Sequence, residues 1–382
     1  MGLHHRKLQL HEIINAMNTE KTYLIRLYFK NALRVGAARS GVGIEASQDY
    51  IHSDSFWAAL ANYWALLGSA GGISFAEFLE GFRVGSTSSG ASSGVPPLFT
   101  ISSVFPFARS SGMRRYWLPK PLSVPFDLST SNSKESRDSE RENYGKALKQ
   151  ARLLSDKTFT NWQAFEHQVG YEVGNEKDFS STGKNNVRPQ SSLDRITSQS
   201  NLFHSGISYL NPNDNDEGLY VLVKTSDERV KEALEEVLDV IRDAGGLGGD
   251  ISSGCGELVN YSIELIGSND KKWAFLRECD GANARCLLSL CLPSDPKTIS
   301  TKLVAYDTVL RKGWTGSLTA SLQRKRQTLY MLSEGTVLSV EEQGQMATIT
   351  PASTKTPDWT GQHPVYRYGY AFSVPIKITF ED

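Results

Sequence analysis

The sequence predicts an α+β protein made of two ferredoxin-like modules. Aromatic and apolar segments of strand length occur near both ends of the chain, at residues 23–29 and 366–379. A thickly apolar helical segment follows the first strand at residues 51–67. A second helical pattern at 230–241 precedes a strand-like stretch at 257–266. The order strand, helix, strand near each end is that of the split βαβ unit.

Length and charge set the outer limits of the interpretation. The 382 residues suggest two or three domains of ordinary globular composition. The formal net charge is −1, so the whole chain has no general attraction to nucleic acid. Its basic residues nevertheless fall into blocks, which can give one basic face or only ordinary solvated surface. The three blocks are Lys21, Arg26, Lys30, Arg34 and Arg39; Arg109, Arg114, Arg115 and Lys120; and Arg311, Lys312, Arg324, Lys325 and Arg326.

Cysteine usage and hydropathy exclude several classes of protein. The four cysteines form no CxxC pair and have no paired histidines beside them, so we expect no metal site and no obligatory disulfide. No apolar run is long enough to cross a membrane. The N-terminus has no apolar signal core, and Arg6 breaks the myristoylation pattern. We therefore expect a cytoplasmic protein without a cofactor or a membrane contact.

The first strand is expected to continue to Val35 and to lead into a buried helix. Ser53 or Asp54 is a good N-cap for that helix, which carries a thickly apolar pattern. His52 precedes the cap. A histidine there either completes the cap, contacts a phosphate at the helix N-terminus or acts as an acid or base.

The middle of the chain alternates polar and regular segments. Residues 85–97 form a Ser/Gly/Pro loop, and residues 98–105 predict a strand. An extended, proline-punctuated segment follows at 106–125. Residues 128–145 are polar and low in apolar content, which predicts disorder, and helical stretches follow at 144–169.

A hairpin and a capped helix are expected next. Residues 201–210 and 218–224 read as two strands joined by the polar turn 211–217. Thr225 with Glu228 has the spacing of a capping box. The residues that then share one helical face are Val230, Leu234, Val237, Leu238 and Ile241.

Half of residues 245–256 are glycine, which makes this the most distinctive stretch of the chain. Glycine admits positive φ and close backbone approach, and its bare amides can turn toward an anion beside Ser252 and Ser253. The order helix, loop, strand is the reverse of that in a Walker loop or a dinucleotide fingerprint, so we expect no nucleotide cofactor. A long polyanion such as RNA fits this loop, although most Gly/Ser runs are flexible surface loops.

Five segments, in this order, resemble the RAMP subunit that caps the 5′ handle of crRNA in type III-A CRISPR effectors, the fourth subunit of the Csm complex. Their order and span cover nearly the whole chain. They are the first strand with residues 52–54; residues 99–107 with 116–121; residues 197–203 with 218–221; residues 247–256; and residues 329–337 with 368–373.

The resemblance implies two RAMP modules, at residues 1–215 and 216–382, with the glycine loop in the second module. It also implies a protruding β-hairpin thumb around residues 187–210. The function it implies is non-catalytic: the subunit binds and caps the crRNA handle, joins the large polymerase/cyclase subunit to a backbone RAMP subunit, and meets target RNA indirectly. Family members usually carry Lys or Arg where this chain has Asp250, which removes one phosphate partner.

Candidate RNA-binding residues follow from the resemblance and the residue chemistry. Arginines of the thumb can grip phosphates, and an apolar side chain can wedge between unstacked bases, although Phe203 also suits an ordinary packed hairpin. The set comprises Gly245, Gly246, Gly248, Gly249, Ile251, Ser252, Ser253, Gly254 and Gly256 in the loop; Arg188, Arg195, Thr197 and Phe203 in the thumb; and Arg34, Arg39, His52, Ser53 and Lys120 elsewhere.

Other functions remain open at this point. A RAMP endoribonuclease that processes crRNA precursors would need a general base, for which His52, His204 and His363 are the candidates; none sits in a diagnostic constellation. A generic RRM-like binder would carry an aromatic RNP signature that is absent here. The equivalent handle-capping subunit of another type III subtype shares the same features.

Overall fold

The computed structural model describes residues 20–30, 32–36, 47–82, 96–110, 112–123, 146, 148–164, 185–210, 217–315, 324–351 and 364–378. These residues form an α+β structure with mostly antiparallel sheets, so the predicted fold class is confirmed. Residues 85–95 of the predicted Ser/Gly/Pro loop, the whole polar segment 128–145 and residues 165–169 of the segment with predicted helical stretches lie outside the described residues. No helix in the described part of the chain is long and apolar enough to cross a membrane.

The largest sheet is centred on strand β1 (Lys21–Phe29), which lies antiparallel between β11 (Gly218–Thr225) and β12 (Leu258–Leu265). Every apolar residue of β11 is buried, as expected of a strand in a sheet that is covered on both faces. The strand order is β12-β1-β11-β6-β7-β8, with β5 also pairing β11. The remaining strands are β5 (Thr100–Ile101), β6 (Phe105–Ser110), β7 (Met113–Pro119) and β8 (Leu153–Ser155).

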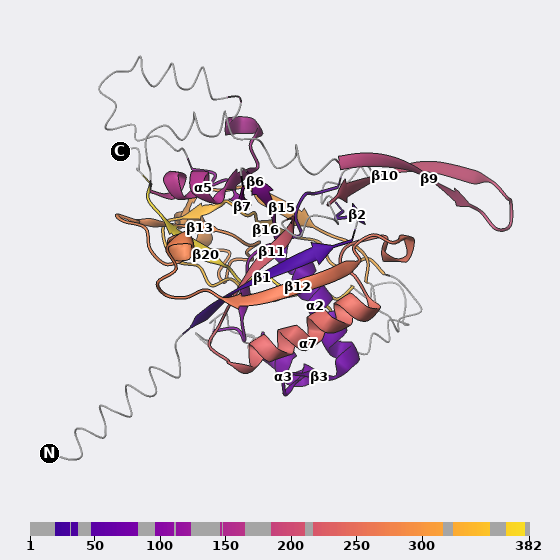
Figure 1. The fold of residues 1–382 in the computed structure, drawn as a ribbon, viewed down its shortest axis with the longest axis horizontal. Helices are drawn as coiled ribbons and strands as arrows, with labels where there is room; N and C mark the ends of the chain where they lie inside the picture. Colours follow the sequence, from indigo (N-terminus) through magenta and orange to yellow (C-terminus); the bar gives the residue numbers. More distant parts are fainter. Residues whose placement is uncertain are drawn as a thin grey trace.

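Helices cover this sheet and give the first module its split βαβ form. Helix α2 (Ser53–Leu67) follows β1, and α7 (Arg229–Ala244) joins β11 to β12. Figure 1 shows α7 lying along β12, with α2 and the short α3 (Phe75–Glu80) beside it. The predicted apolar face of α7 is buried throughout, so this prediction is confirmed.

The predicted capping box of α7 is wrong. The helix begins at Arg229, and the carboxylate of Asp227 accepts its amide hydrogen at 3.0 Å. The Thr225 hydroxyl instead accepts from the Asp227 amide, and the Glu228 carboxylate pairs with Lys21 on the surface. Glu228, the acid of the predicted capping box, is therefore used in a tertiary ion pair with Lys21 of β1.

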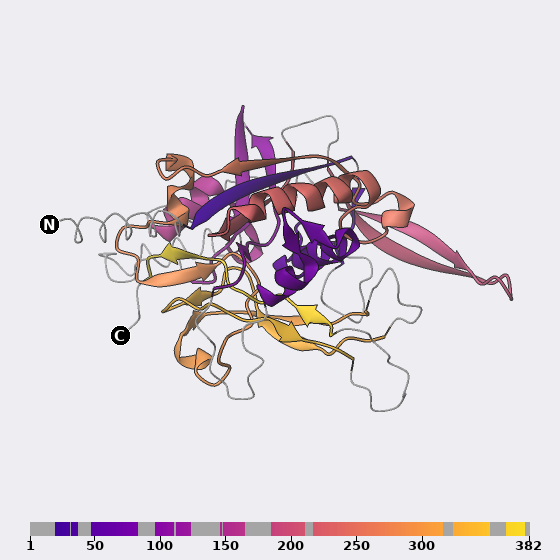
Figure 2. The ribbon, with the colours of Figure 1, turned by 90° about the horizontal axis from the view of Figure 1, so that it is seen from below.

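A second module is built on a four-stranded sheet of order β14-β17-β13-β20. Between residues 280 and 378 the described residues form no α-helix, only strands and one 3₁₀ turn. Figure 2 shows these orange and yellow strands on the opposite side of the molecule from α7. The strands of this sheet are β13 (Ala284–Leu287), β14 (Leu303–Ala305), β17 (Val337–Leu338) and β20 (Ser373–Ile376). Two further two-stranded ribbons belong to this module. One pairs β15 (Thr308–Arg311) with β16 (Leu329–Leu332), and the other pairs β18 (Ala347–Thr348) with β19 (Tyr366–Arg367).

The module boundary expected between residues 215 and 216 cuts through the first sheet. Strands β11 and β12 lie beyond that boundary in sequence but hydrogen-bond to β1 on either side. By strand pairing, the first module extends to the end of β12, and the glycine loop belongs to it. One continuous core nevertheless joins the modules, from Leu24 in β1 to Val374 in β20.

Two predicted strand arrangements also differ. Strand β10 (Ser200–Tyr209) pairs with β9 (Asn185–Leu193) and with β2 (Ala32–Leu33), not with β11. The strand expected at 98–105 divides into β5 and β6. It is interrupted because the amide of Ser103 donates to Leu288 of the second module at 2.8 Å instead of to β11.

Candidate nucleic-acid interface

The glycine loop is a folded turn docked on strand β2. The amide of Gly256 donates to the carbonyl of Ala32 at 2.7 Å, and the amide of Gly249 donates to the carbonyl of Arg34 at 2.8 Å. The Leu247 amide donates to the carbonyl of Gly256 at 3.0 Å and closes the loop on itself. The loop is therefore held in place by backbone hydrogen bonds rather than hanging free.

Several of the glycines are needed for this packing. Gly248 has a φ of 96°, and a Cβ there would lie 2.5 Å from the carbonyl oxygen of Arg34. Gly256 has a φ of 74°, and its Cβ would overlap the carbonyl oxygen of Leu247. Gly245 and Gly246 pack against Tyr63, whose hydroxyl accepts from the Gly246 amide at 3.1 Å. These glycines hold the turn, and Gly246 and Gly256 are buried.

The exposed part of the loop is the 3₁₀ turn η2 (Ile251–Ser253) with Gly254. As the first residues of a helical turn, Ile251 and Ser252 have amides without an intrahelical acceptor. The hydroxyls of Ser252 and Ser253 are on the surface beside them. This combination of amides and hydroxyls suits a phosphate or a ribose.

Asp250 and Arg34 neutralise each other. The Arg34 guanidinium donates to the Asp250 carboxylate, and both side chains are partly buried. Asp250 has a φ of 55°, and its carbonyl accepts from the amides of Ser253 and Cys255. The acid that stands where a basic residue was expected is thus paired, and Arg34 is committed to it rather than available to a phosphate.

The thumb forms and protrudes. Strands β9 and β10 pair along their length and extend away from the rest of the molecule (Figures 1 and 2). At the tip, the Asp194 carboxylate accepts from the amides of Ile196 and Thr197, at 2.7 and 3.2 Å. The Ile196 side chain is 94% exposed. Arg195 is exposed beside it, while Thr197 is part of the turn.

The sequence analysis did not identify the most exposed apolar side chains of the thumb. Phe203, the predicted wedge, is half-buried and belongs to none of the described core clusters, so the structure does not support the alternative interpretation in which it packs into the core. Ile196 and Leu202 are more exposed than Phe203, and a β-branched residue at a turn was the available signal. The exposed large apolar residues of the thumb are Val187, Leu193, Ile196 and Leu202.

The glycine loop and the base of the thumb form one surface. Ala32 of β2, Ile207 of β10 and Cys255 of the loop pack together as a small buried cluster. Arg188 lies over the ring of Tyr209, with 5.1 Å between the guanidinium carbon and the ring centroid. Burial raises the pKa of the Cys255 thiol, and the nearby positive charge of Arg188 opposes that rise. Arg188 therefore lies close to the glycine loop, at the foot of the thumb.

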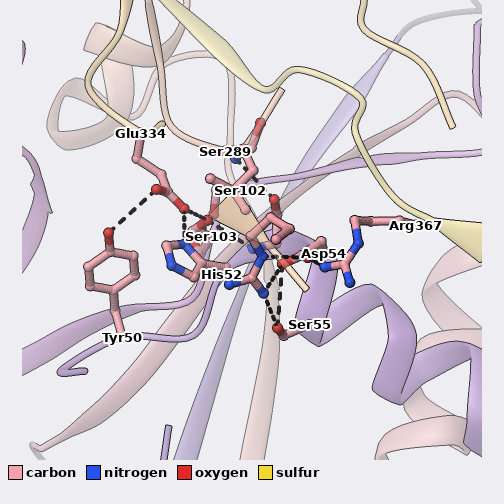
Figure 3. Close-up of polar contacts among 12 residues, drawn as sticks. Tyr50, His52, Asp54, Ser55, Ser102, Ser103, Ser289, Glu334 and Arg367 are labelled. Carbon is pink, nitrogen blue, oxygen red and sulfur yellow. Dashed lines mark hydrogen bonds and ion pairs between the residues drawn. The ribbon is translucent and has the colours of Figure 1, made fainter. Parts of the chain in front are cut away.

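His52 and Ser53 do not lie on this surface, so their assignment to RNA binding is wrong for this conformation. His52 is 2% exposed, and its Nδ1 lies 2.7 Å from a carboxylate oxygen of Glu334 (Figure 3). The Ser53 hydroxyl accepts from the Leu290 amide at 3.1 Å. The predicted N-cap at Ser53 or Asp54 is wrong, because α2 begins at Ser53 and its N-cap position is His52, which makes no side-chain capping bond. Both residues connect the start of α2 to the second module.

The same junction contains a buried ion cluster. The Asp54 carboxylate accepts from Arg311 at 2.8 and 2.9 Å and also from Arg367 (Figure 3). Burial opposes ionisation of Asp54, but the two arginines outweigh it and lower its pKa to about 2. Burial likewise opposes ionisation of Glu334, and His52 with Ser103 holds the pKa of Glu334 below its usual value. The network holds the two modules together.

The remaining predicted residues divide between packing and undescribed chain. Lys120 is half-buried and donates to the carbonyl of Leu148, and burial lowers its pKa. Arg39 and His363 lie outside the described residues. His204 is exposed on the thumb. The structure thus brings together the exposed half of the glycine loop, Arg188 and the thumb, and places Lys120, His52 and Ser53 elsewhere.

Comparison with known proteins agrees with the sequence interpretation. Residues 280–376 match the family described as the CRISPR Csm4 C-terminal domain. No curated protein matches the chain. The matched residues coincide with the second module, which supports the division by strand pairing.

Solved structures share the fold over almost the whole chain. A Csm1–Csm4 cassette crystallised with cA4 is 17% identical, with a TM-score of 0.55, over 94% of this chain and 100% of the matched chain. A Csm3–Csm4 subcomplex of the type III-A interference complex is 14% identical, with the same TM-score and the same coverage. At this identity the likeness shows the fold. Together with the family match, it confirms the resemblance to the fourth Csm subunit.

Proposed function

We propose that this Csm4-like RAMP chain is a non-catalytic subunit of a type III CRISPR effector that binds the 5′ handle of crRNA. The handle would lie across the exposed part of the glycine loop and the base of the thumb. It would make contacts with the backbone amides of Ile251 and Ser252, with the hydroxyls of Ser252 and Ser253, and with Arg188. Such contacts go to phosphate and ribose, so they position the RNA without reading every base.

One observation carries this proposal: strand β2 holds the glycine loop and the thumb in a fixed relation. The carbonyls of Ala32 in β2 and of Arg34 just after it accept hydrogen bonds from backbone amides of the loop, and β2 also pairs with β10. The loop therefore presents exposed backbone amides next to a protruding hairpin that carries Arg188 and Arg195. A preformed surface of this kind loses little conformational entropy on binding, which favours recognition of RNA by its shape.

The partners follow from the related complexes. The matched structures contain a Csm4 chain with Csm1 in one case and with Csm3 in the other. We extend this to the present chain, which would join a large polymerase/cyclase subunit to a backbone RAMP subunit and meet target RNA only through the crRNA. A cytoplasmic location is part of the same proposal.

The proposal is tested by placing negative charge on the loop. The double variant Ser252→Glu, Ser253→Glu should bind a crRNA handle oligonucleotide at least about tenfold more weakly, because charge-assisted contacts are worth about 1.5–3 kcal/mol each. The matched control is Ser252→Ala, Ser253→Ala at the same exposed positions. Equal handle affinity for the glutamate variant and the parent would refute handle binding at this loop.

The thumb has a separate role in this proposal. Its exposed Ile196 would separate the last handle nucleotide from the first guide nucleotide, at a cost of a few kcal/mol for the lost stacking step. Shortening the tip between residues 188 and 201 should leave the handle bound but change the chemical reactivity of the bases at the handle–guide junction. Unchanged reactivity in the shortened variant would exclude a wedge.

Absence of catalysis is the remaining part of the proposal. Of the three histidines considered as general bases, His52 is buried against Glu334 and has no access to a substrate. We expect no multiple-turnover cleavage of a crRNA precursor by the purified chain. Cleavage that disappears in His204→Ala or His363→Ala would instead establish an endoribonuclease.

A further inference from the structure

A second ribbon of the molecule carries the third basic block and is not used by the proposed handle site. Beyond Arg311, at the end of β15, the chain continues as residues 312–315 and pairs with residues 324–326, which lead toward β16. The Thr315 amide donates to the carbonyl of Arg324 at 2.6 Å, and the Arg326 amide donates to the carbonyl of Gly313 at 2.9 Å. Trp314 and Lys325 are directly opposite in this ribbon.

Beneath the ribbon lies an excess of buried positive charge. We call Arg311, Arg326 and Arg367 the arginine cluster. Among the described residues, Asp54 is the one carboxylate that pairs with Arg311 and Arg367, and the Nε of Arg326 and the Nε and Nη2 of Arg367 have no hydrogen-bond partner. Arg367 is more than nine-tenths buried. Burial and the neighbouring guanidiniums lower the pKa of Arg326 to about 10, which still leaves it charged at neutral pH.

The cluster is continuous with the outer surface. A Cβ at Gly313 would lie 2.8 Å from an Nη atom of Arg326, so the guanidinium lies directly against the ribbon. Outside it, Lys312 and Lys325 are exposed. Among these groups, three guanidiniums and two ammonium groups against the one carboxylate of Asp54 sum to a net charge of +4. An anion is the ligand that such a field attracts.

The aromatic residue at this surface indicates which anion. Trp314 is 54% exposed, and the Lys325 ammonium lies 5.4 Å from the centroid of its ring. An exposed indole flanked by cations is the combination that holds single-stranded nucleic acid, because every base has a face to stack and every nucleotide has a phosphate to pair. An acidic protein segment would satisfy the charge but would not explain the exposed indole.

We propose that Lys312, Trp314 and Lys325 form a second contact for single-stranded RNA, with a base stacked on Trp314 and phosphates on the two lysines. The arginine cluster beneath adds to the attraction without touching the RNA. This inference rests on the proposed function, since it assumes that the chain binds RNA. It adds a site on the second module, away from the glycine loop and the thumb.

The experiment measures binding of two RNA probes to the full-length chain, a handle oligonucleotide and an unstructured 30-nucleotide oligouridine, as a function of salt. Trp314→Ala should weaken oligouridine binding between about 5- and 150-fold, which corresponds to about 1–3 kcal/mol for one stacked base. Trp314→Phe should restore most of it. The double variant Lys312→Ala, Lys325→Ala should lower the slope of log K against log salt by about 1.4, since each lost phosphate contact contributes ~0.7.

The controls use equally exposed residues elsewhere. Tyr306→Ala removes an exposed aromatic, and Lys271→Ala with Lys297→Ala removes two exposed lysines. Trp314 and lysine variants that bind oligouridine like these controls, while the parent binds both probes, would overturn the second site and leave the handle site intact. A parent chain that binds neither probe would overturn both. Loss of a partner subunit with unchanged RNA binding would reassign the surface to a protein contact.

Discussion

Asp54 at the module junction gives a test of how the two halves of the protein are held together. Its carboxylate is buried and accepts from both Arg311 and Arg367. The change Asp54→Asn keeps the shape of the side chain but removes the negative charge. Two buried guanidiniums then have no counter-ion, and breaking a buried pair in this way costs about 3–5 kcal/mol of unfolding free energy.

The same carboxylate predicts a specific dependence on pH. Its pKa in the folded protein is about 2, below its ordinary 3.8. A lowered carboxylate pKa stabilises the fold above pH 3.8, and that stabilisation is lost as pH falls toward 2. The difference of about 1.8 pKa units corresponds to about 2 kcal/mol. The gap in stability between parent and variant should therefore narrow by about 2 kcal/mol between pH 5 and pH 2.

Urea denaturation of both proteins at a series of pH values measures this gap. Glu341→Gln is the matched control, because Glu341 pairs with Arg285 on the surface at 2.8 Å and should cost no more than about 1 kcal/mol. A gap below 1 kcal/mol at pH 7, or a gap that stays constant down to pH 2, would refute the reasoning. Glu334 contributes acid sensitivity of the same sign, but it is present in both proteins and cancels in the comparison.

Two further predictions concern the glycine loop and the cysteines. Gly254 and Gly256 both have a positive φ, but of these two only Gly256 lacks room for a Cβ. Gly254→Ala should lower the free energy of unfolding by about 1–2 kcal/mol, and Gly256→Ala should lower it clearly more. Equal losses in the two variants would contradict the packing argument. Burial raises the pKa of the Cys286 and Cys291 thiols and keeps solvent away from them. Iodoacetamide at pH 8 should therefore label the half-buried Cys279 first, and Cys286 and Cys291 only after unfolding. Peptide mass spectrometry at successive times measures the order in which the cysteines are labelled.

The local pattern of the sequence was sufficient to predict the elements with strong periodicity. The apolar face of α7 can be identified from consecutive residues, and the helix buries that face. The alternating stretch at 257–266 forms strand β12 as predicted, but Val259 and Leu265 on its apolar side stay exposed. The glycine loop between them was equally evident, because few folded segments need so many residues free of a Cβ. Its exposed residues, Ser252 and Ser253, are where the sequence placed them.

Pairing between distant residues was decided only by the tertiary structure. Strand β10 finds β9 and β2 rather than the next strand in sequence, which turns the expected hairpin into the thumb. His52 and Ser53 have the residue types of a phosphate site, yet contacts with Glu334 and Leu290, more than 230 positions away, bury them.

Asp250 shows the same division. From the sequence, an acid at position 250 indicates that one phosphate partner is lost. Only the folded loop shows that Arg34 pairs with its carboxylate. The physical reason is that backbone conformation and periodic burial depend on neighbours in sequence. The partner of a charge or of a strand edge depends on which distant segment the core brings beside it.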